Sequence, residues 1–574
     1  MGWLDDDVRW ASGAWSLARR DDELADIAHD GRAVLRSIRL VVRDHDWETA
    51  ALVVDAVHED DRMLRLDVHS EGLGSSFSGS LSVQVDGDAL EVDAELVSAE
   101  AFSTNRTGLV VLHPPSLAGR ALTVTHSDGS VSHARFPPEI SPHQPVADIA
   151  ALAWRSDAGP AEIAFTGDVF EMEDQRNWTD ASFKTYSRPL VLPFPYPVAA
   201  GERVHQSVRV TVTGAADAAR TALPGELALH PGGRIPAIGV GASTAPHPAP
   251  RERAVPAATV LVELDLASPT WRAALERAAR AGQPLDVRVV VDEDAPTALA
   301  DAVAALRALP VARVAAFRAA GDARHVSDVE TVSALRDALA RAGVPAPVAG
   351  GVRTHFTELN REHSRLPRGL DGIGFAVTPL FHSRSTAQLI ESIAMQRLVA
   401  EQAVRIAAGT PVDIGPVTLR PHVNGVSTAP APMAAHDDLR DGYGPHLLDA
   451  DDSRIDAPEL AAWTIASAAA LAVPGVRSLA LFEEWGPRGL LDSAGRERPV
   501  AAAVRALAGL SGAESLVGDS PDGLVWALGA VTAGGPVALV ASLDRVPRTV
   551  RVRAGAAAAS VSLAPFAWTT TPLP

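Results

Sequence analysis

The chain has 574 residues, 47% of them hydrophobic and 21% charged, and a formal net charge of −20 at pH 7. This length and composition indicate a globular protein of roughly two to four domains. The negative charge argues against nucleic acid or an anionic membrane as a partner, because both would repel the chain. No cysteine occurs, which excludes disulfides, thiolate metal sites and thiol nucleophiles.

The first residues give no sign of export. Residues 1–7, Met-Gly-Trp-Leu-Asp-Asp-Asp, lack the basic and apolar regions of a secretory signal. Nor does the chain contain an uninterrupted apolar run of about 18 residues, the length of a transmembrane helix. We therefore expect a cytoplasmic protein without a membrane partner, and the sequence leaves open whether it forms a homo-oligomer.

Residues 1–216 are predicted to form an antiparallel β-sandwich. Apolar and polar residues alternate with the period of a strand, and turn sequences such as Asp86-Gly-Asp separate the runs. Many short strands at this spacing are typical of a sandwich. The expected strands include residues 34–42, 49–54, 63–68, 80–85, 90–97, 108–112 and 208–212.

One segment of this domain concentrates scarce residue types. Lys184 is the sole lysine, so arginine supplies every other cation among the 51 Lys and Arg residues. Lysine is a compact, strongly hydrated charge, whereas arginine is a planar fork that keeps its proton. The alternative is codon bias that left one surface lysine by chance. We favour a substrate-binding segment at residues 168–186, and its candidates are Glu173, Asn177, Trp178, Asp180, Lys184 and Tyr186.

Residues 217–508 are predicted to form a (β/α)8 TIM barrel, with a Pro-, Ala- and Gly-rich linker over residues 217–257. Amphipathic helical stretches that end in glycine separate most of the apolar strands, and eight such units suit a barrel of this size. The expected strands are residues 237–241, 259–264, 285–291, 314–317, 347–352, 372–377, 412–419 and 477–482. Residues 509–574 return to strands and predict a small C-terminal β domain.

Barrel enzymes carry their active sites at the carboxyl ends of the strands. In this chain, the polar residues at the carboxyl ends of predicted strands five to eight include both acids and bases. We predict Glu358, Glu483 and His382 as catalytic, with Asn360 and Arg420 binding substrate. Each has a structural alternative. Glu358 and Asn360 could cap the next helix, His382 could be a core histidine, and Arg420 could hold a loop carboxylate.

The sequence lacks the motifs of several common kinds of binding site and catalytic mechanism. The His-x-His and His-Glu-x-x-His metal spacings are absent, and Gly239-Val-Gly-Ala-Ser does not match a phosphate or dinucleotide loop. We therefore expect no cofactor and assign no metal ligands, and the sequence leaves open whether the reaction needs a metal. There is no Gly-x-Ser-x-Gly nucleophile elbow either, which leaves attack by water assisted by carboxylate, histidine or lysine. Predicted strands four and seven end at Phe317 and Leu419 without the carboxylates that many barrel glycosidases carry there.

The stretch over residues 170–186 resembles the signature segment of D-apionate lactonases, which open D-apionolactone in bacterial apiose catabolism. Four shorter segments are also similar to that family, and the likeness runs from about residue 30 to 500. They are residues 105–114, 140–145, 356–361 and 418–421.

The resemblance implies a hydrolase acting on a small-molecule sugar lactone. Opening a lactone needs activated water, stabilisation of the oxyanion and protonation of the leaving alkoxide. We expect Glu358 or Glu483 as base, the other or His382 as acid, and Lys184 or Arg420 near the oxyanion. Two alternatives remain from the residues. One is a glycoside hydrolase that acts on an apiose- or arabinose-type pentofuranoside and uses Glu358 and Glu483 as its catalytic carboxylate pair. The other is a carbohydrate-binding protein without catalytic activity.

Overall fold

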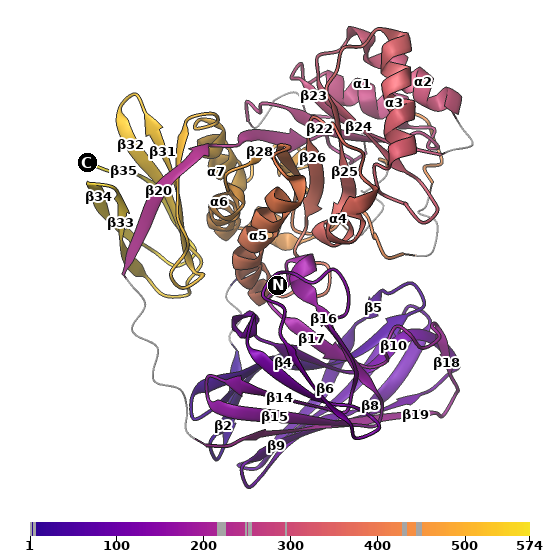
Figure 1. Cartoon of the computed structure of the whole chain (residues 1–574), viewed down its shortest axis with the longest axis vertical. Helices are drawn as coiled ribbons and strands as arrows, with labels where there is room; N and C mark the ends of the chain where they lie inside the picture. Colours follow the sequence, from indigo (N-terminus) through magenta and orange to yellow (C-terminus); the bar gives the residue numbers. More distant parts are fainter. Residues whose placement is uncertain are drawn as a thin grey trace.

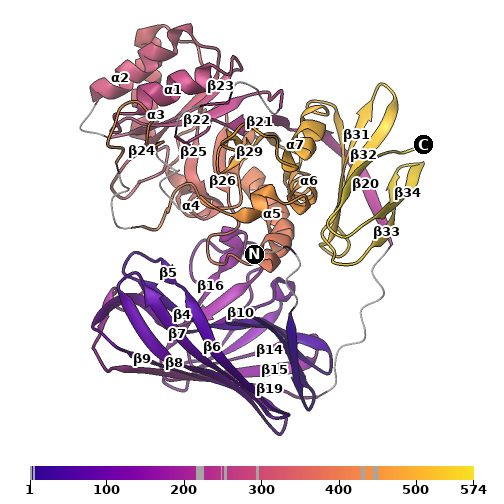
Figure 2. The ribbon, with the colours of Figure 1, turned by 180° about the vertical axis from the view of Figure 1, so that it is seen from behind.

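The computed structural model describes residue 3 and residues 7–214, 225–246, 249–250, 255–292, 296–427, 433–443 and 450–574. These residues form a pair of antiparallel sheets, a closed parallel barrel and a third sheet at the C-terminus. Figure 1 shows the paired sheets below the barrel and the C-terminal sheet beside it, and Figure 2 shows the same arrangement from behind. The predicted fold class is confirmed.

The first N-terminal sheet carries the side chains that matter for the site. Its ten strands run in the order β1-β2-β3-β4-β10-β17-β16-β13, with β18 paired to β10 and β5 to β4. Their bounds are β1 (Val8–Ser12), β2 (Trp15–Arg20), β3 (Glu23–His29), β4 (Arg32–Asp44), β5 (Thr49–Ala50), β10 (Phe102–His113), β13 (Val146–Ile149), β16 (Phe170–Asp174), β17 (Phe183–Tyr186) and β18 (Tyr196–Val198).

The second N-terminal sheet packs its apolar face on the first. Nine strands follow the order β12-β11-β14-β15-β19-β9-β8-β7-β6. On β9, Val92, Ala94 and Leu96 are buried in the shared core while the acidic residues between them face outward, the alternation expected of a half-buried strand. The bounds are β6 (Leu52–Glu59), β7 (Met63–Gly72), β8 (Ser75–Asp86), β9 (Ala89–Ser98), β11 (Ala121–Thr125), β12 (Val131–Arg135), β14 (Ala151–Ser156), β15 (Gly159–Thr166) and β19 (Arg203–Val212).

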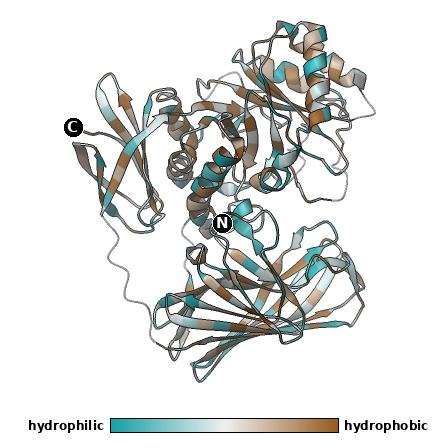
Figure 3. Ribbon diagram, in the orientation of Figure 1, coloured by the Kyte–Doolittle hydropathy of each residue, from teal (hydrophilic) through white to brown (hydrophobic). Residues whose placement is uncertain are grey.

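The barrel contains the eight strands predicted from the sequence. They are parallel neighbours in chain order, and pairing between the first and last strands closes the ring. Both faces are covered, so most residues of the strands are apolar, although buried charges such as Asp286 and Arg313 also occur in them. Figure 3 shows brown segments along the barrel. The bounds are β21 (Ala237–Gly241), β22 (Val260–Asp265), β23 (Leu285–Val291), β24 (Val311–Arg318), β25 (Val348–His355), β26 (Ile373–Val377), β27 (Val412–Val417) and β28 (Val476–Trp485), with β29 (Gly489–Leu491) added to β28.

Helices surround these strands, and two of them, α3 (Val329–Ala342) and α5 (Thr386–Ala407), begin at a side-chain cap. In α3, the Asp328 side chain accepts a hydrogen bond from Thr331 N, and Gly343 ends the helix at φ 66°, which glycine adopts without strain. The others are α1 (Trp271–Ala279), α2 (Pro296–Ala305), α4 (Phe356–Glu362), α6 (Glu459–Leu471) and α7 (Val500–Ala508). No helix among the described residues is long and apolar enough to span a membrane.

The C-terminal sheet corrects one part of the predicted domain organisation. Its strand β20 (Glu226–Arg234) lies within residues 217–257, which we expected to be a linker leading into the barrel. It pairs in parallel with β33 and antiparallel with β30, far along the chain. The predicted barrel segment, residues 217–508, therefore includes a strand of the third sheet. The remaining bounds are β30 (Glu514–Val517), β31 (Val525–Thr532), β32 (Gly535–Ser542), β33 (Arg548–Ala554), β34 (Ala557–Leu563) and β35 (Trp568–Pro572).

The first N-terminal sheet meets the barrel through the short 3-10 helix η2 (Gln175–Trp178), which joins β16 to the loop before β17. This helix contacts α4 and α5, both of which follow barrel strands. Figures 1 and 2 both place β16 and the turn after it against these helices. The segment over residues 168–186 therefore packs at the barrel rim, as predicted from its composition.

Candidate active site

A cavity of about 280 Å³ lies where this segment meets the barrel, close to the lower end of the roughly 300–1,000 Å³ typical of small-molecule sites. Its floor is one face of the sheet formed by β4, β10, β17 and β16. Its opposite wall comes from α4 and from the loop between β26 and α5. The polar side chains that line it are Glu23, Arg36, Arg39, Arg43, Arg106, Gln144, Glu173, Gln175, Asp180, Ser182, Lys184, Ser187, Arg361, His382, Ser383 and Gln388.

Local structure fixes the turn that carries the site. The Asp174 side chain accepts a hydrogen bond from Arg176 N at the start of η2, and its Oδ2 lies 2.7 Å from Arg176 Nη2. Both side chains are buried, so the pair satisfies groups that would otherwise be costly to bury. Thr179 ends η2 with φ 66°. This turn reverses the chain, so that Trp178 and Asp180 both face the barrel.

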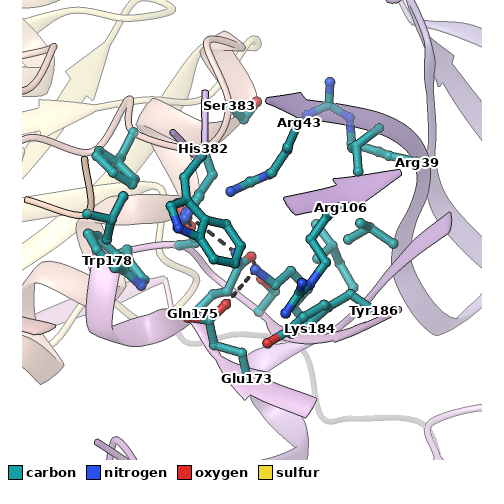
Figure 4. Close-up of a pocket in the computed structure, with 18 of the residues that line it drawn as sticks. Arg39, Arg43, Arg106, Glu173, Gln175, Trp178, Lys184, Tyr186, His382 and Ser383 are labelled. Carbon is teal, nitrogen blue, oxygen red and sulfur yellow. Dashed lines mark hydrogen bonds and ion pairs between the residues drawn. The ribbon is translucent and has the colours of Figure 1, made fainter. Parts of the chain in front are cut away.

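Lys184 lies on the cavity floor and is buried. Sheet register places it between Leu112 on β10 and Glu173 on β16. Its Nζ is 2.5 Å from Glu173 Oε2 and 4.6 Å from the centre of the Tyr186 ring. Figure 4 shows the three side chains close together at the cavity. The ammonium is therefore held at one point by a carboxylate and by an aromatic face.

The two partners respond differently to this environment. Burial lowers the pKa of Lys184, and Glu173 only partly offsets the effect. Burial also opposes the charge on Glu173, but Lys184, His382 and Arg361 together lower the pKa of Glu173 to about 2. Glu173 is thus an anion at neutral pH.

His382 and Asp180 form a hydrogen-bonded pair across the domain boundary. His382 Nδ1 lies 2.5 Å from Asp180 Oδ2, and Gln388 Nε2 donates to the other carboxylate oxygen. Since a carboxylate only accepts, Nδ1 carries the proton, and the lone pair of a neutral imidazole is then on Nε2. No described residue forms a hydrogen bond with Nε2. Burial lowers the pKa of His382 and the Asp180 carboxylate opposes the shift, so the neutral ring is favoured.

Aromatic side chains hold this pair in place. The Trp178 ring stacks on Phe381 with centroids 4.6 Å apart and an interplanar angle of 8°. Its centre is also 5.2 Å from the His382 ring in an edge-on arrangement. These contacts fix the imidazole orientation and provide an apolar wall that suits one face of a sugar ring.

Four arginines on the floor, Arg36, Arg39, Arg43 and Arg106, were not identified from the sequence. Arg43 on β4 lies directly opposite Arg106 on β10, and both line the cavity. The Arg43 guanidinium points into the cavity in Figure 4. The predicted strand stopped at residue 42, one position short of Arg43. The alternation of Arg39, Val41 and Arg43 on one strand face was the available signal.

Six of the predicted site residues come together in this cavity. They are Glu173, Trp178, Asp180, Lys184, Tyr186 and His382. Tyr186 also donates a hydrogen bond of 2.6 Å to Glu171 Oε1, which fixes its ring beneath Lys184.

Asn177 and Asn360 lie beside the cavity. Asn360 Nδ2 donates to Asn177 Oδ1 at 2.9 Å and to the Ile140 carbonyl at 3.1 Å. Both asparagines are buried, and the bonds join the N-terminal sheet to α4. Their position suits a role in domain docking.

The remaining three predicted residues lie outside the cavity lining. Glu358 on α4 accepts a hydrogen bond from Thr354 Oγ1 at 2.8 Å. Glu483 is buried at the end of β28 and accepts hydrogen bonds from both the backbone and the side chain of Thr244. Arg420 reaches toward the Asp451 carbonyl. Burial raises the pKa of both glutamates.

Among the described residues, no three His, Asp or Glu side chains lie together in a position to hold a metal ion. The chemistry that the cavity itself offers is proton transfer by His382 beside several fixed positive charges. A neutral base, a carboxylate that orients it and cations near the reacting group are the elements of hydrolysis at a carbonyl.

Comparisons with known proteins cover most of the chain. Residues 3–215 match the family model described as D-apionate lactonase, N-terminal domain, and residues 240–512 match that described as D-apionate lactonase, TIM barrel domain. A D-apionate lactonase of Brucella anthropi is 28% identical over 561 residues, which cover 89% of each chain.

The solved structures that match this chain share little sequence with it. A beta-arabinopyranosidase is 11% identical, with 99% of each chain covered and a TM-score of 0.31. A GH30 endoxylanase from Clostridium papyrosolvens C71 is 9% identical, covers 60% of this chain and 98% of its own, and has a TM-score of 0.41.

Proposed function

This chain belongs to the D-apionate lactonase family, and from that membership we propose that it hydrolyses D-apionolactone to D-apionate in the cavity between sheet and barrel. The resemblance found in the sequence is thereby confirmed, and the chain is an enzyme of the hydrolase class. The substrate and the mechanism are our proposal. The observation that carries it is the His382–Asp180 pair, which lines the same small cavity as Lys184.

The proposed reaction begins with water bound to His382 Nε2. The imidazole removes a proton as the water oxygen attacks the lactone carbonyl carbon, and Asp180 stabilises the imidazolium that forms. The carbonyl oxygen becomes an oxyanion, and Lys184 on the cavity floor stabilises the negative charge. Relative to the sequence prediction, His382 takes the role of base that we first gave to Glu358 or Glu483.

Collapse of the tetrahedral intermediate completes the reaction. The bond from the carbonyl carbon to the ring oxygen breaks, and the ring oxygen leaves as an alkoxide. The proton on His382 Nε2 passes to this oxygen, so the imidazole returns to its neutral form. The carboxylic acid that forms loses its proton to solvent. Trp178 and Tyr186 provide apolar and aromatic surface for the sugar carbons.

His382→Asn tests this assignment. We expect kcat on D-apionolactone to fall by about 10²–10⁴-fold, the range for losing a general base, while KM changes much less. The matched control is His58→Asn, because His58 pairs with Asp67 at 2.9 Å in an exposed position of the second sheet. Turnover near the wild-type level in His382→Asn would remove this histidine from the mechanism and return attention to Glu358 and Glu483.

A further inference from the structure

Arg43 differs from Arg36 and Arg39 on the cavity floor, because each of those two has a carboxylate partner. Arg36 lies 2.6 Å from Glu391 and Arg39 lies 3.1 Å from Asp22. Among the described residues, none forms a hydrogen bond or an ion pair with the Arg43 guanidinium. A half-buried cation that faces a cavity without a counter-ion from the described residues is unusual, because charged groups away from bulk water are normally paired.

The residue opposite Arg43 on the neighbouring strand adds a second positive charge. Arg106 lies directly opposite Arg43 in the sheet register, and like charges in this arrangement repel. The Arg106 guanidinium cannot swing away easily, because it lies over the rings of Trp47, Tyr186 and Phe194 at 5.1, 5.4 and 5.7 Å. These contacts stabilise the cation and hold its positive charge beside Arg43.

The lining as a whole is positively charged. It contains six cationic side chains and three carboxylates, although the chain carries a net charge of −20. Glu173 is already engaged by Lys184 at 2.5 Å and Asp180 by His382 at 2.5 Å. The charges of Glu173 and Asp180 act on Arg43 only from beyond ion-pair distance, so an anionic ligand in the cavity would be its first close counter-ion.

We propose that Arg43 is a further catalytic residue. It contacts the lactone carbonyl oxygen as that oxygen becomes an oxyanion, and it then binds the carboxylate of the product. This inference rests on the proposed function, because it assigns Arg43 to the same reaction at the same site. A guanidinium matches the two oxygens of a carboxylate, so the enzyme binds its own product and is inhibited by it.

The test compares Arg43→Met and Arg43→Lys with wild type and with Arg135→Met, an exposed arginine of the second sheet. Kinetics on D-apionolactone give kcat and KM. Inhibition constants are measured for D-apionate and for apiitol, the uncharged alcohol with the same carbon skeleton. We expect Arg43→Met to lower kcat by about 10²–10³-fold, the effect of losing one preorganised donor, with KM nearly unchanged.

The inhibitors separate a catalytic role from a structural one. Wild type and Arg135→Met should bind the acid at least about tenfold more tightly than the alcohol, which corresponds to one good charge-assisted interaction. Arg43→Met should lose this preference while binding of apiitol is unchanged, and Arg43→Lys should recover part of it. The inference is overturned if Arg43→Met keeps the preference, or if it weakens acid and alcohol equally.

The outcomes also separate this inference from the proposed function. A wild-type enzyme that opens the lactone, together with an Arg43→Met variant of normal kcat and normal acid preference, would overturn the role of Arg43 alone. A wild-type enzyme that fails to open the lactone would overturn the proposed function and with it the catalytic role of Arg43. If that inactive enzyme still preferred the acid, and lost the preference in Arg43→Met, the carboxylate contact would stand without the chemistry.

Discussion

At the scale of single residues, the pairing of His382 with Asp180 predicts how activity depends on pH. The base is the neutral imidazole, so kcat/KM should fall as pH drops through the pKa of His382. Burial lowers this pKa, and the midpoint should therefore lie below the ordinary histidine value of about 6.5. Asp180 works in the opposite direction, since its negative charge favours the protonated ring.

Asp180→Asn should therefore move the acid limb to lower pH and also reduce the maximal rate, because the imidazolium loses its stabilising charge. A pH profile of kcat/KM for wild type and variant checks both effects. If the limb moves to higher pH, or keeps its midpoint, Asp180 does not act on His382 as the structure implies.

Lys184 allows a second prediction at this scale. Arginine would keep the charge but is longer and planar, and the space between Glu173 and the Tyr186 ring is fitted to an ammonium 2.5 Å from the carboxylate. We expect Lys184→Arg and Lys184→Met each to lower kcat by about 10²–10³-fold. The control is Arg203→Lys, since Arg203 pairs with Glu95 at an exposed site, where such pairs contribute little. A fully active Lys184→Arg enzyme would support the codon-bias interpretation instead.

At the scale of secondary structure, local patterns were enough for most of the fold. The eight barrel strands are apolar runs bounded by helical segments, and their type and order follow from burial on both faces. Strand β20 was missed because its pairing with β33 depends on a partner far along the chain. Nothing within Glu226–Arg234 indicates which sheet it joins.

The candidate site likewise contains residues that local sequence identifies and residues that only long-range contacts identify. The segment that carries Glu173, Trp178, Asp180 and Lys184 could be identified because its composition is unusual within one stretch of sequence. The pairing of His382 with Asp180 required two segments 202 positions apart to meet. Arg43 is one arginine among many, and its opposition to Arg106 is visible only in the register of β4 and β10.

At the scale of the whole molecule, the site belongs to neither domain alone. The sheet provides Asp180 and Lys184, and the barrel provides His382. Interactions away from the cavity also hold the two parts together. Arg36 Nε lies 2.6 Å from Glu391 Oε2, and the buried asparagine pair links η2 to α4.

The last prediction concerns this division. A protease site inserted between residues 214 and 225 would allow the N-terminal sheets to be cut from the rest of the chain, with β20 starting the second fragment. We expect the cleaved protein to elute as one complex in gel filtration and to keep most of its activity, because the buried polar contacts and the Trp178–Phe381 stack persist without the covalent link. Asn360→Leu removes two interdomain hydrogen bonds, so the same cut should weaken association in that variant. A site shared by the sheet and the barrel requires both fragments. If the wild-type fragments separated and one of them kept full activity, that fragment would carry the whole site and the shared site would be wrong.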